Sequence, residues 1–431
     1  MGASRAAATR RSVTARALAA DLVNTVILHG RSLTSALDAI RGAHDGRALA
    51  TAQDLAYGAL RHYGRLRFYL DRLVGKPLDP AELSGHLRVA LFALSDRDAP
   101  HYAVVNETVE QAALLQPRTR GFVNAVLRGF LRRHDQLDLA KENDEVARWN
   151  FPAWWIERLR EQYPADWQAV LTSMNDHPPM TLRINQRRID MPAYQAMLDA
   201  AGMTWRQTGE CALTLNRPVR VGELPGFEAG LVSVQDLGAQ YACALLDCIG
   251  GTRVLDACAA PGGKTAHLLE AHDLDVVALD ADPGRLTRVA DNLKRLGLTA
   301  RLRAADAGQP NDWWDGQPFQ RILLDAPCTG SGVVRRHPDG KWLKRCEDVT
   351  HLAVEQARLL DAVWPLLDHG GKLLYATCSL FRQENGDQVE AFLRRHPDAR
   401  LESTDLPDTG VGPLLPNRDH DGFFYARILK A

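Results

Sequence analysis

The stretch RVLDACAAPGGKT, residues 253–265, decides the fold of the second half of this 431-residue chain. It begins with a short apolar run, typical of a buried strand, and continues into a loop of small residues. Gly262 and Gly263 allow the backbone to approach a ligand closely. The helix that follows begins with N–H groups that have no partner within the helix. The stretch therefore predicts a strand, a ligand-binding loop and a helix start.

Strands and helices alternate from residue 236 to the end of the chain. We expect strands near residues 252–257, 275–280, 300–305, 321–326, 371–377 and 422–429. We expect helices near residues 264–272, 284–297, 348–367 and 385–396. This alternation predicts a doubly wound, Rossmann-like α/β domain with a parallel sheet. In such a domain the ligand crevice lies at the carboxyl ends of the strands.

Two aspartates follow the second and third of these strands. Asp280 lies 16 residues beyond Lys264, where a carboxylate accepts hydrogen bonds from both ribose hydroxyls of a nucleoside. Asp306 lies where it can accept from an adenine amino group. Either residue alone is more readily explained as a turn or cap residue at a strand end. A glycine loop and two acids after three successive strands favour a nucleoside-containing ligand.

The end of the loop has a competing interpretation. Gly263-Lys264-Thr265 resembles the end of a phosphate-binding P-loop, G-x-x-x-x-G-K-[ST], and the strand ending at Asp325 resembles the metal-binding strand of such an enzyme. However, the first glycine of that motif would fall at Cys258, and Pro261 stiffens a loop that should wrap a phosphate. A P-loop-like NTPase is therefore the less favoured alternative.

Two cysteines also follow predicted strands. Cys328 lies in LDAPCTG, residues 324–330, and Cys378 lies in LLYATCS, residues 373–379. An isolated cysteine at a strand end is usually an inert core residue, but these two lie in small-residue loops at one crevice. A thiolate is a strong nucleophile, and addition to C6 of a pyrimidine makes C5 able to take a methyl group from a sulfonium donor. Asp325 is placed to hydrogen-bond the N3–N4 edge of the base.

The sequence alone leaves the roles of the two thiols open. One must attack C6, and the other is a plausible base for removing the C5 proton afterwards. Either cysteine could fill either role, since each lies in a small-residue loop after a predicted strand.

Composition is that of an ordinary soluble protein, with 45% hydrophobic and 24% charged residues and a formal net charge of −1. No apolar run reaches the roughly 18 residues of a membrane span, and no signal peptide is evident. The seven cysteines are odd in number and form no C-x-x-C pair, which gives no support to a zinc site. We expect a reduced, cytoplasmic protein without metal.

The motifs as a set resemble the NOL1/NOP2/Sun family of RNA 5-methylcytosine methyltransferases over residues 145–431. The resemblance includes residues 181–185, 234–236, 335–339, 341–342 and 421–427. It implies that S-adenosyl-L-methionine is the cofactor and that Cys378 is the nucleophile, while Cys328 assists product release. The cofactor contacts that it implies are Cys258, Ala259, Ala260, Pro261, Gly262, Gly263, Lys264, Asp280, Asp306 and Asp325.

The first 140 residues have the periodicity of amphipathic helices. HYAVVNETVE, residues 101–110, and GFVNAVLR, residues 121–128, resemble the NusB-like RNA-binding fold. Their apolar positions are predicted core: Val104, Val105, Val109, Val123, Val126 and Leu127. Arginines offer an RNA-facing patch or only a solvated face: Arg118, Arg120, Arg128, Arg132 and Arg133. Near the N-terminus, the same two interpretations apply to Arg5, Arg10, Arg11 and Arg16.

A NusB-like domain joined to this catalytic domain is similar to bacterial members of the family. That resemblance implies 16S ribosomal RNA as the partner and its cytosine 967 as the target. We expect a multidomain, monomeric protein: a NusB-like helical domain (1–145), a small mixed α/β RNA-recognition or linker domain (146–235) and a Rossmann-like methyltransferase domain (236–431). The alternative from another class is a non-catalytic RNA-binding factor, and the presence of both cysteines argues against it.

Overall fold

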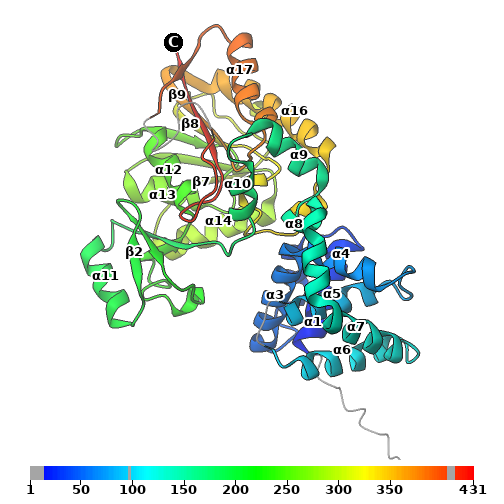
Figure 1. The fold of residues 1–431 in the computed structure, drawn as a ribbon. Helices are drawn as coiled ribbons and strands as arrows, with labels where there is room; N and C mark the ends of the chain where they lie inside the picture. Colours follow the sequence, from blue (N-terminus) through cyan, green and yellow to red (C-terminus); the bar gives the residue numbers. More distant parts are fainter. Residues whose placement is uncertain (1–13, 96–98, 405–412) are drawn as a thin grey trace, which may run out of the picture. The chain divides into compact units, whose positions relative to one another are not determined.

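The computed structural model covers residues 1–431 and describes residues 14–95, 99–404 and 413–431 (Figure 1). Arg5, Arg10 and Arg11 lie outside the described residues. The chain forms two compact units. The first contains Met1–Ile156 together with His337–Leu343, and the second contains Glu157–Arg336 together with Lys344–Ala431. None of the helices in the described residues is long and apolar enough to cross a membrane.

The first unit is helical, as its sequence predicts. Helix α5 (Leu83–Ser95) is buried along nearly its whole length and packs against α1, α3, α4, α6 and α7. The predicted apolar positions of α6 and α7 all lie in this core, with Val104, Val123 and Leu127 fully buried. The other helices are α1 (Ala15–Ile27), α2 (Leu33–Ile40), α3 (Gly46–Arg61), α4 (Tyr63–Leu73), α6 (His101–Leu115), α7 (Thr119–Ala140) and α8 (Glu145–Trp149).

A segment from late in the chain completes this helical unit. Helix α15 (Gly340–Leu343) belongs to it, and so does the residue before α15, Asp339. The Asp339 carboxylate accepts from the Leu33 N–H at 2.9 Å. Lys341 is fully buried and donates to the Arg61 carbonyl at 3.0 Å. Its burial lowers the pKa of the Lys341 ammonium well below the ordinary value. The segment is therefore an integral part of the helical core.

The second unit contains a seven-stranded sheet in the order β10-β11-β9-β8-β5-β6-β7. Strands β5 to β9 are parallel to their neighbours, whereas β11 is antiparallel to β9 and β10 is antiparallel to β11. The bounds are β5 (Arg253–Asp256), β6 (Asp275–Asp280), β7 (Arg301–Ala304), β8 (Phe319–Asp325), β9 (Leu367–Thr377), β10 (Ala399–Glu402) and β11 (Phe424–Lys430).

Each predicted strand of this sheet is present, but the sheet is mixed, not wholly parallel. The strand expected at 422–429 is β11, and it runs antiparallel beside β9. The short strand β10 was not predicted from the sequence. A parallel neighbour needs a long crossover connection, usually a helix, and β11 instead pairs directly with β10, the strand before it. The apolar pattern of β11 predicts a strand but does not specify its direction.

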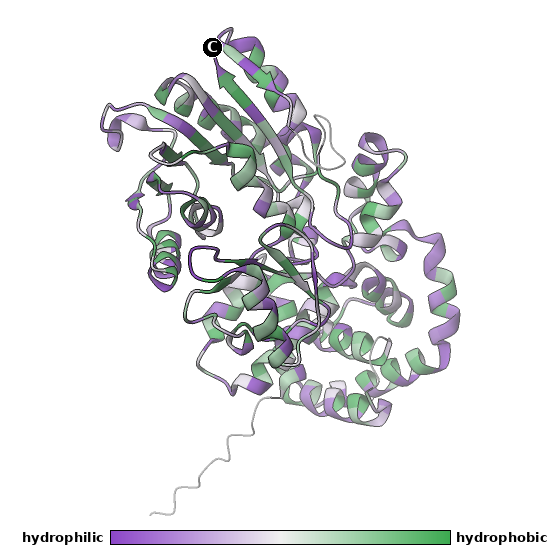
Figure 2. Ribbon diagram, turned by 90° about the vertical axis from the view of Figure 1, so that its left-hand side faces the viewer, coloured by the Kyte–Doolittle hydropathy of each residue, from purple (hydrophilic) through white to green (hydrophobic). Residues whose placement is uncertain are grey.

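Helices cover both faces of the sheet because its central strands are apolar on both sides. Val254 of β5 packs with α12, α13 and α14, whereas the next residue, Leu255, packs with α16 and α17 on the opposite face. Figure 2 shows the largely apolar strands and the mixed character of the helices around them. The helices are α12 (Leu237–Leu246), α13 (Gly263–Ala271), α14 (Pro283–Leu296), α16 (Cys346–Val363) and α17 (Gly386–Arg395).

Local signals set the helix ends. Asp282 accepts from the Gly284 and Arg285 N–H groups at the start of α14, and Pro283 occupies its first turn. Gly297 ends α14 with a φ of +67°, a conformation that a side chain at this position would oppose. Such signals explain why the predicted helices of the second unit nearly coincide with the observed ones.

A smaller antiparallel sheet precedes the large one in the chain. Its order is β2-β3-β1-β4, and α11 (Met191–Ala200) packs on it through Tyr194 and Leu198. The strands are β1 (Met180–Ile184), β2 (Trp205–Gln207), β3 (Ala212–Leu215) and β4 (Val232–Val234). This sheet and helix agree with the mixed α/β character expected for the middle of the chain, and two of the strands, β2 and β4, have only three residues each. Two helices, α9 (Ala153–Gln162) and α10 (Trp167–Ser173), come before it.

Candidate active site

The topology brings the predicted site residues to one edge of the large sheet. Strand β5 lies between β6 and β8, and β9 follows on the other side of β8, all parallel. Their carboxyl ends therefore point the same way. The glycine loop follows β5, Asp280 ends β6, Asp325 ends β8 and Cys378 follows β9. In the β8–β9 ladder Asp325 pairs with Ala376, so the chains leading to the two cysteines leave the sheet side by side.

The loop after β5 requires glycine at position 262, and Arg183 of the small sheet holds the end of the loop. Gly262 has a φ of +96°, and a Cβ there would lie 3.1 Å from Val289. The carbonyl of Gly263 accepts from Arg183 of β1 at 2.7 Å. Arg183 is fully buried, and its guanidinium donates to both oxygens of Glu270 at 2.8 Å. The small sheet thus holds the start of α13 through the Gly263 carbonyl and its last turn through a buried ion pair that sequence analysis did not predict.

Asp280 contacts the same loop. It is 4% exposed, and its carboxylate accepts from the Ala260 N–H at 3.1 Å and the Asp282 N–H at 3.0 Å. The Arg285 guanidinium donates to the Ala260 carbonyl at 2.9 Å. Asp280 therefore does serve as a turn residue. A carboxylate has about four acceptor positions, so this role leaves acceptor capacity for a ligand.

Asp306, the third predicted acid, is more exposed. Its carboxylate accepts from Arg358 at 3.0 Å and from the Gly308 N–H at 2.8 Å. Burial alone would raise the pKa of Asp306, but the hydrogen bonds from Arg358 and Gly308 outweigh it and lower the pKa below the ordinary value. The carboxyl therefore stays ionised and able to accept further hydrogen bonds.

Lys264 joins the glycine loop to β8. Its ammonium lies 2.5 Å from the Asp325 carboxylate, and its side chain is 11% exposed. Burial alone would lower the pKa of Lys264, but the charge of Asp325 and the hydrogen bond to it raise the pKa above its ordinary value. The P-loop alternative would place a phosphate at this lysine. In this structure the cation is already neutralised by a carboxylate of the neighbouring strand.

The two cysteines lie together. Their Sγ atoms are 3.4 Å apart, a hydrogen-bonding separation, and both thiols are free. The hydrogen bond with Cys378, followed by burial, raises the pKa of Cys328 well above the ordinary thiol value. The raised pKa favours the protonated form of Cys328.

Glu384 connects the two cysteine loops, and sequence analysis did not identify it. Its fully buried carboxylate accepts from the Thr329 N–H at 2.8 Å and the Thr329 hydroxyl at 2.6 Å, beside Cys328. It also accepts from the Ser379 hydroxyl at 2.5 Å, beside Cys378, and from Gln356 at 3.1 Å. Burial raises the pKa of Glu384, and these hydrogen bonds oppose the shift. One carboxylate thus fixes both loops, because each cysteine is followed by a hydroxyl residue that binds it.

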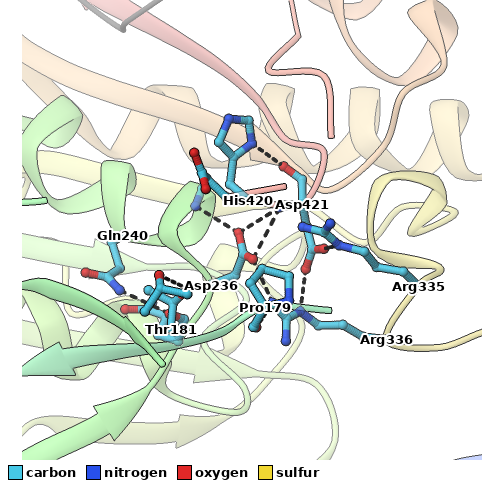
Figure 3. Close-up of polar contacts among 12 residues, drawn as sticks. Pro179, Thr181, Asp236, Gln240, Arg335, Arg336, His420 and Asp421 are labelled. Carbon is cyan, nitrogen blue, oxygen red and sulfur yellow. Dashed lines mark hydrogen bonds and ion pairs between the residues drawn. The ribbon is translucent and has the colours of Figure 1, made fainter. Parts of the chain in front are cut away.

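A second polar network lies around Asp421 (Figure 3). Asp421 accepts from both Arg335 and Arg336, and Arg336 also donates to Asp236 at 2.7 Å and to the Pro179 carbonyl at 3.0 Å. Burial would lower the pKa of Arg336, but Asp421 and Asp236 raise it above its ordinary value.

This network reaches the backbone beside the cysteines. The Gly422 N–H donates to the Gly332 carbonyl at 2.9 Å, and the Gly332 N–H donates to the Cys378 carbonyl at 2.8 Å. A Cβ on Gly332 would lie 2.3 Å from the Gly422 carbonyl oxygen, so this close approach requires glycine. Sequence analysis identified residues 335–339 and 421–427 only as points of resemblance, without a role.

Asp256, at the end of β5, is buried beneath the site. Its Oδ2 accepts from the Thr265 hydroxyl at 2.6 Å, whereas its Oδ1 has no hydrogen-bond partner. Burial raises the pKa of Asp256 to about 7. In the parts of the chain that the structure describes, no group of three or more His, Cys, Asp or Glu side chains is arranged to hold a metal ion.

Comparisons with known proteins agree with this architecture. The family described as 16S rRNA methyltransferase RsmB/F matches residues 243–429. The RsmF/B-like, ferredoxin-like domain matches residues 151–222, and the NusB family matches residues 13–132.

Relatives match over nearly their whole length. Ribosomal RNA small subunit methyltransferase B of Vibrio cholerae is 45% identical over 421 residues, which cover 96% of this chain and 97% of that protein. The protein of the same name from Escherichia fergusonii is 42% identical over 422 residues, 96% of this chain and 98% of that one.

Solved structures match as well. The crystal structure of PH0851 is similar with a TM-score of 0.79 at 26% identity, covering 97% of this chain and 99% of that one. A methyltransferase homolog protein from Pyrococcus horikoshii has a TM-score of 0.60 at 27% identity, covering 67% of this chain and 98% of that one.

These matches confirm the resemblance seen in the sequence. The first unit contains a NusB domain, the small sheet belongs to a ferredoxin-like domain, and the seven-stranded sheet forms a Rossmann-like methyltransferase domain. With 45% identity across nearly the full length of both chains, the chain belongs to the RsmB/F family of ribosomal RNA methyltransferases.

Proposed function

We propose that this protein transfers a methyl group from S-adenosyl-L-methionine to C5 of a cytosine in 16S ribosomal RNA, with cytosine 967 as the target. The transfer proceeds through a covalent bond between Cys378 and C6 of the base. The observation that carries the proposal is the pair of thiols, 3.4 Å apart, at the carboxyl edge of a methyltransferase sheet. The names of the relatives support a substrate in the small ribosomal subunit.

The residues around the glycine loop fit the proposed cofactor. When bound, S-adenosyl-L-methionine supplies an electrophilic methyl group on a sulfonium sulfur. Asp280 and Asp306 provide carboxylates for ribose hydroxyls and an adenine amino group, and residues 258–264 provide a close backbone surface. Asp325 ends the strand that precedes Cys328, and about a third of its side chain is exposed. This carboxyl can therefore reach a ligand while it pairs with Lys264.

The contact between the two thiols supports different roles for them. In this proposal Cys328, whose pKa is raised, donates the hydrogen bond and so stabilises negative charge on the Cys378 sulfur. Lys264 lies near enough for the charge of Cys378 to act on it. Cys378 is therefore the thiol prepared to attack C6.

The contact between Cys328 and Cys378 also determines when Cys328 can act as a base in the second half of the reaction. The first cause of the raised pKa of Cys328 is its hydrogen bond to Cys378. Once the Cys378 sulfur is bonded to C6, it carries no charge to be stabilised, so the pKa of Cys328 falls. Cys328 then releases its own proton to solvent, and the resulting thiolate accepts the C5 proton after methyl transfer. Loss of that proton expels the Cys378 thiolate from C6 and restores the aromatic base.

Two alanine variants test the proposal. Cys378→Ala should form no covalent complex with RNA. Cys328→Ala should accumulate a complex of protein and methylated RNA that survives denaturation and requires S-adenosyl-L-methionine. Denaturing gels with radiolabelled RNA distinguish them. A complex from Cys378→Ala but not from Cys328→Ala would reverse the two roles, and no methylation of 16S RNA by the unaltered protein would refute the function.

A further inference from the structure

Helices α6 and α7 of the NusB domain lie side by side (Figure 1) and border a groove of about 520 Å³. The groove is lined by apolar residues Val105 and Val109 and by polar side chains of Asn106, Asn124 and Arg128. Tyr102 stands at its side and is 80% exposed. Soluble proteins rarely leave such a combination of apolar lining and exposed aromatic ring without a binding function.

The charged side chains beside the groove indicate which class of molecule it binds. Of the five arginines predicted from the sequence, Arg118 is paired with Asp79 at 2.8 Å and Arg120 with Glu110 at 2.6 Å. Arg128 donates to the Asn124 amide oxygen at 3.1 Å. Within residues 14–95, 99–404 and 413–431, no carboxylate forms an ion pair with Arg128, Arg132 or Arg133.

Two of these unneutralised cations, Arg128 and Arg132, form a short stripe on α7. Arg128 and Arg132 are four residues apart on α7 and therefore lie on the same face of the helix. The stripe begins at the groove, because Arg128 lines it, and it extends one helical turn to Arg132. An anionic chain that follows the stripe would bring a group into the groove.

We propose that this groove binds one unstacked nucleotide of single-stranded RNA, with its base against Tyr102 and its phosphates on Arg128 and Arg132. Base stacking on an exposed aromatic ring is the usual way in which proteins bind unpaired RNA. The amides of Asn106 and Asn124 provide a donor and an acceptor each for the polar edge of the base. In a duplex the bases are stacked inside the helix, so duplex RNA offers the groove no base.

The proposal rests on the proposed function in one respect, that the substrate is RNA. It adds that the NusB domain holds an unpaired segment of that RNA at a site of its own. The groove lies entirely within the first unit, so its binding can be measured separately from methyl transfer.

The test measures binding of the full-length protein to a fluorescein-labelled 12-nucleotide single-stranded RNA and to its duplex, by anisotropy at several salt concentrations. Tyr102→Ala should weaken single-strand binding by about 5- to 100-fold, the cost of one stacked base, and leave duplex binding unchanged. Tyr102→Phe should restore the affinity. Arg128→Gln should lower the slope of log affinity against log salt by about 0.7.

Arg118→Gln is the matched control, because its cation is already neutralised by Asp79. It should change neither the affinity nor the slope. Tyr102 is 80% exposed, so its replacement leaves the helical core intact, which circular dichroism would verify. Equal loss of single-strand and duplex binding in Tyr102→Ala, or no loss, would overturn the proposal.

A methylation assay on 16S RNA, run in parallel, separates the two proposals. Methylation together with unchanged binding by Tyr102→Ala would refute the groove and leave the function standing. A tyrosine-dependent affinity without methylation would refute the function and leave the groove standing.

Discussion

Replacement of Glu384 by glutamine tests how the two cysteine loops are fixed. The glutamate accepts four hydrogen bonds: two from Thr329, one from Ser379 and one from Gln356. Glutamine has the same shape but one oxygen and one amide nitrogen. The hydroxyls of Thr329 and Ser379 can rotate to accept from the new nitrogen, so the variant should fold.

The structure sets the size of the effect. A hydrogen bond to a charged group contributes about 1 kcal/mol more than one between neutral groups, so four such bonds set an upper limit of about 4 kcal/mol. Burial disfavours the charge of Glu384, as its raised pKa shows, and removing a buried charge offsets part of the loss. We expect a net destabilisation of about 1–3 kcal/mol. A displacement of about 1 Å in the cysteine loops lowers the rate by about 100-fold, so methyl transfer should slow by about 10- to 100-fold.

The pH dependence distinguishes this role from a merely structural one. The charge of Glu384 contributes to the raised pKa of Cys328, after the hydrogen bond with Cys378, burial and the charge of Cys378. Glu384→Gln should therefore lower the pKa of Cys328 and move the rise in the rate of product release to lower pH. Single-turnover assays with labelled RNA at a series of pH values would measure both steps.

A matched control keeps this test specific. Gln388 is also buried, and its amide donates to the Ala353 carbonyl without contacting either cysteine loop. Gln388→Met should cost similar stability with little effect on rate. The cofactor affinity of Glu384→Gln should equal that of the unaltered protein, because the glycine loop is untouched. An unchanged rate and an unchanged pH profile in Glu384→Gln would refute the reasoning.

Three further predictions concern residues that contact the glycine loop or lie beneath it. Asp280→Ala should weaken S-adenosyl-L-methionine binding by about 1–3 kcal/mol, since it removes a charged acceptor; unchanged affinity by calorimetry would exclude Asp280 from the site. Arg183→Met should cost about 3–5 kcal/mol in urea unfolding because it leaves Glu270 buried and unpaired, and adding Glu270→Met should restore most of that loss. Asp256 has a native pKa of about 7 against about 3.8 when unfolded, so its contribution to stability is full below pH 4 and is lost as the pH rises to 7. Thermal unfolding of Asp256→Asn from pH 4.5 to 8 should lack that decline, and an equal decline in both proteins would contradict the assignment.

Local sequence patterns predicted much of the fold. Continuous apolar runs predicted β5, β6, β8 and β9, because strands buried on both faces are apolar at every position. Asp282, Pro283 and Gly297 set the limits of α14 through capping and backbone conformation. The strand β10 was missed because its four residues are mostly half-exposed and carry two charges.

The convergence of the predicted site residues follows from a property of parallel sheets that can be applied to the sequence directly. The loops after parallel strands lie at a common edge of the sheet, so Cys328 and Cys378 were expected to converge, and they do. The residues that were missed act over long distances in the chain. Arg183 and Glu270 are 87 residues apart, and Glu384 and Thr329 are 55 apart. A single sequence gives no indication of which distant residue a buried charged side chain will contact.

The arginines of α7 illustrate the same limit on a surface. The sequence places Arg118, Arg120 and Arg128 in one cluster of like charge. The structure separates them, because Asp79 and Glu110 neutralise the first two. Only a folded chain shows which cations stay available to a phosphate.

The segment 337–343 has a consequence for how this protein is made. A ribosome synthesises residues 14–156 long before it reaches Lys341 and Trp342. Until then, the carbonyls of Arg61 and Leu60 lack the donors that they have in the finished protein. The helical unit therefore reaches its final state only after most of the methyltransferase domain has been translated. In a fragment ending near residue 156, the site that Lys341 and Trp342 occupy would be empty and open to solvent. Removal of the N-terminal helices would expose Lys341 and Trp342 to water. The helical unit is therefore not complete in residues 14–156 alone, although it has a hydrophobic core of its own.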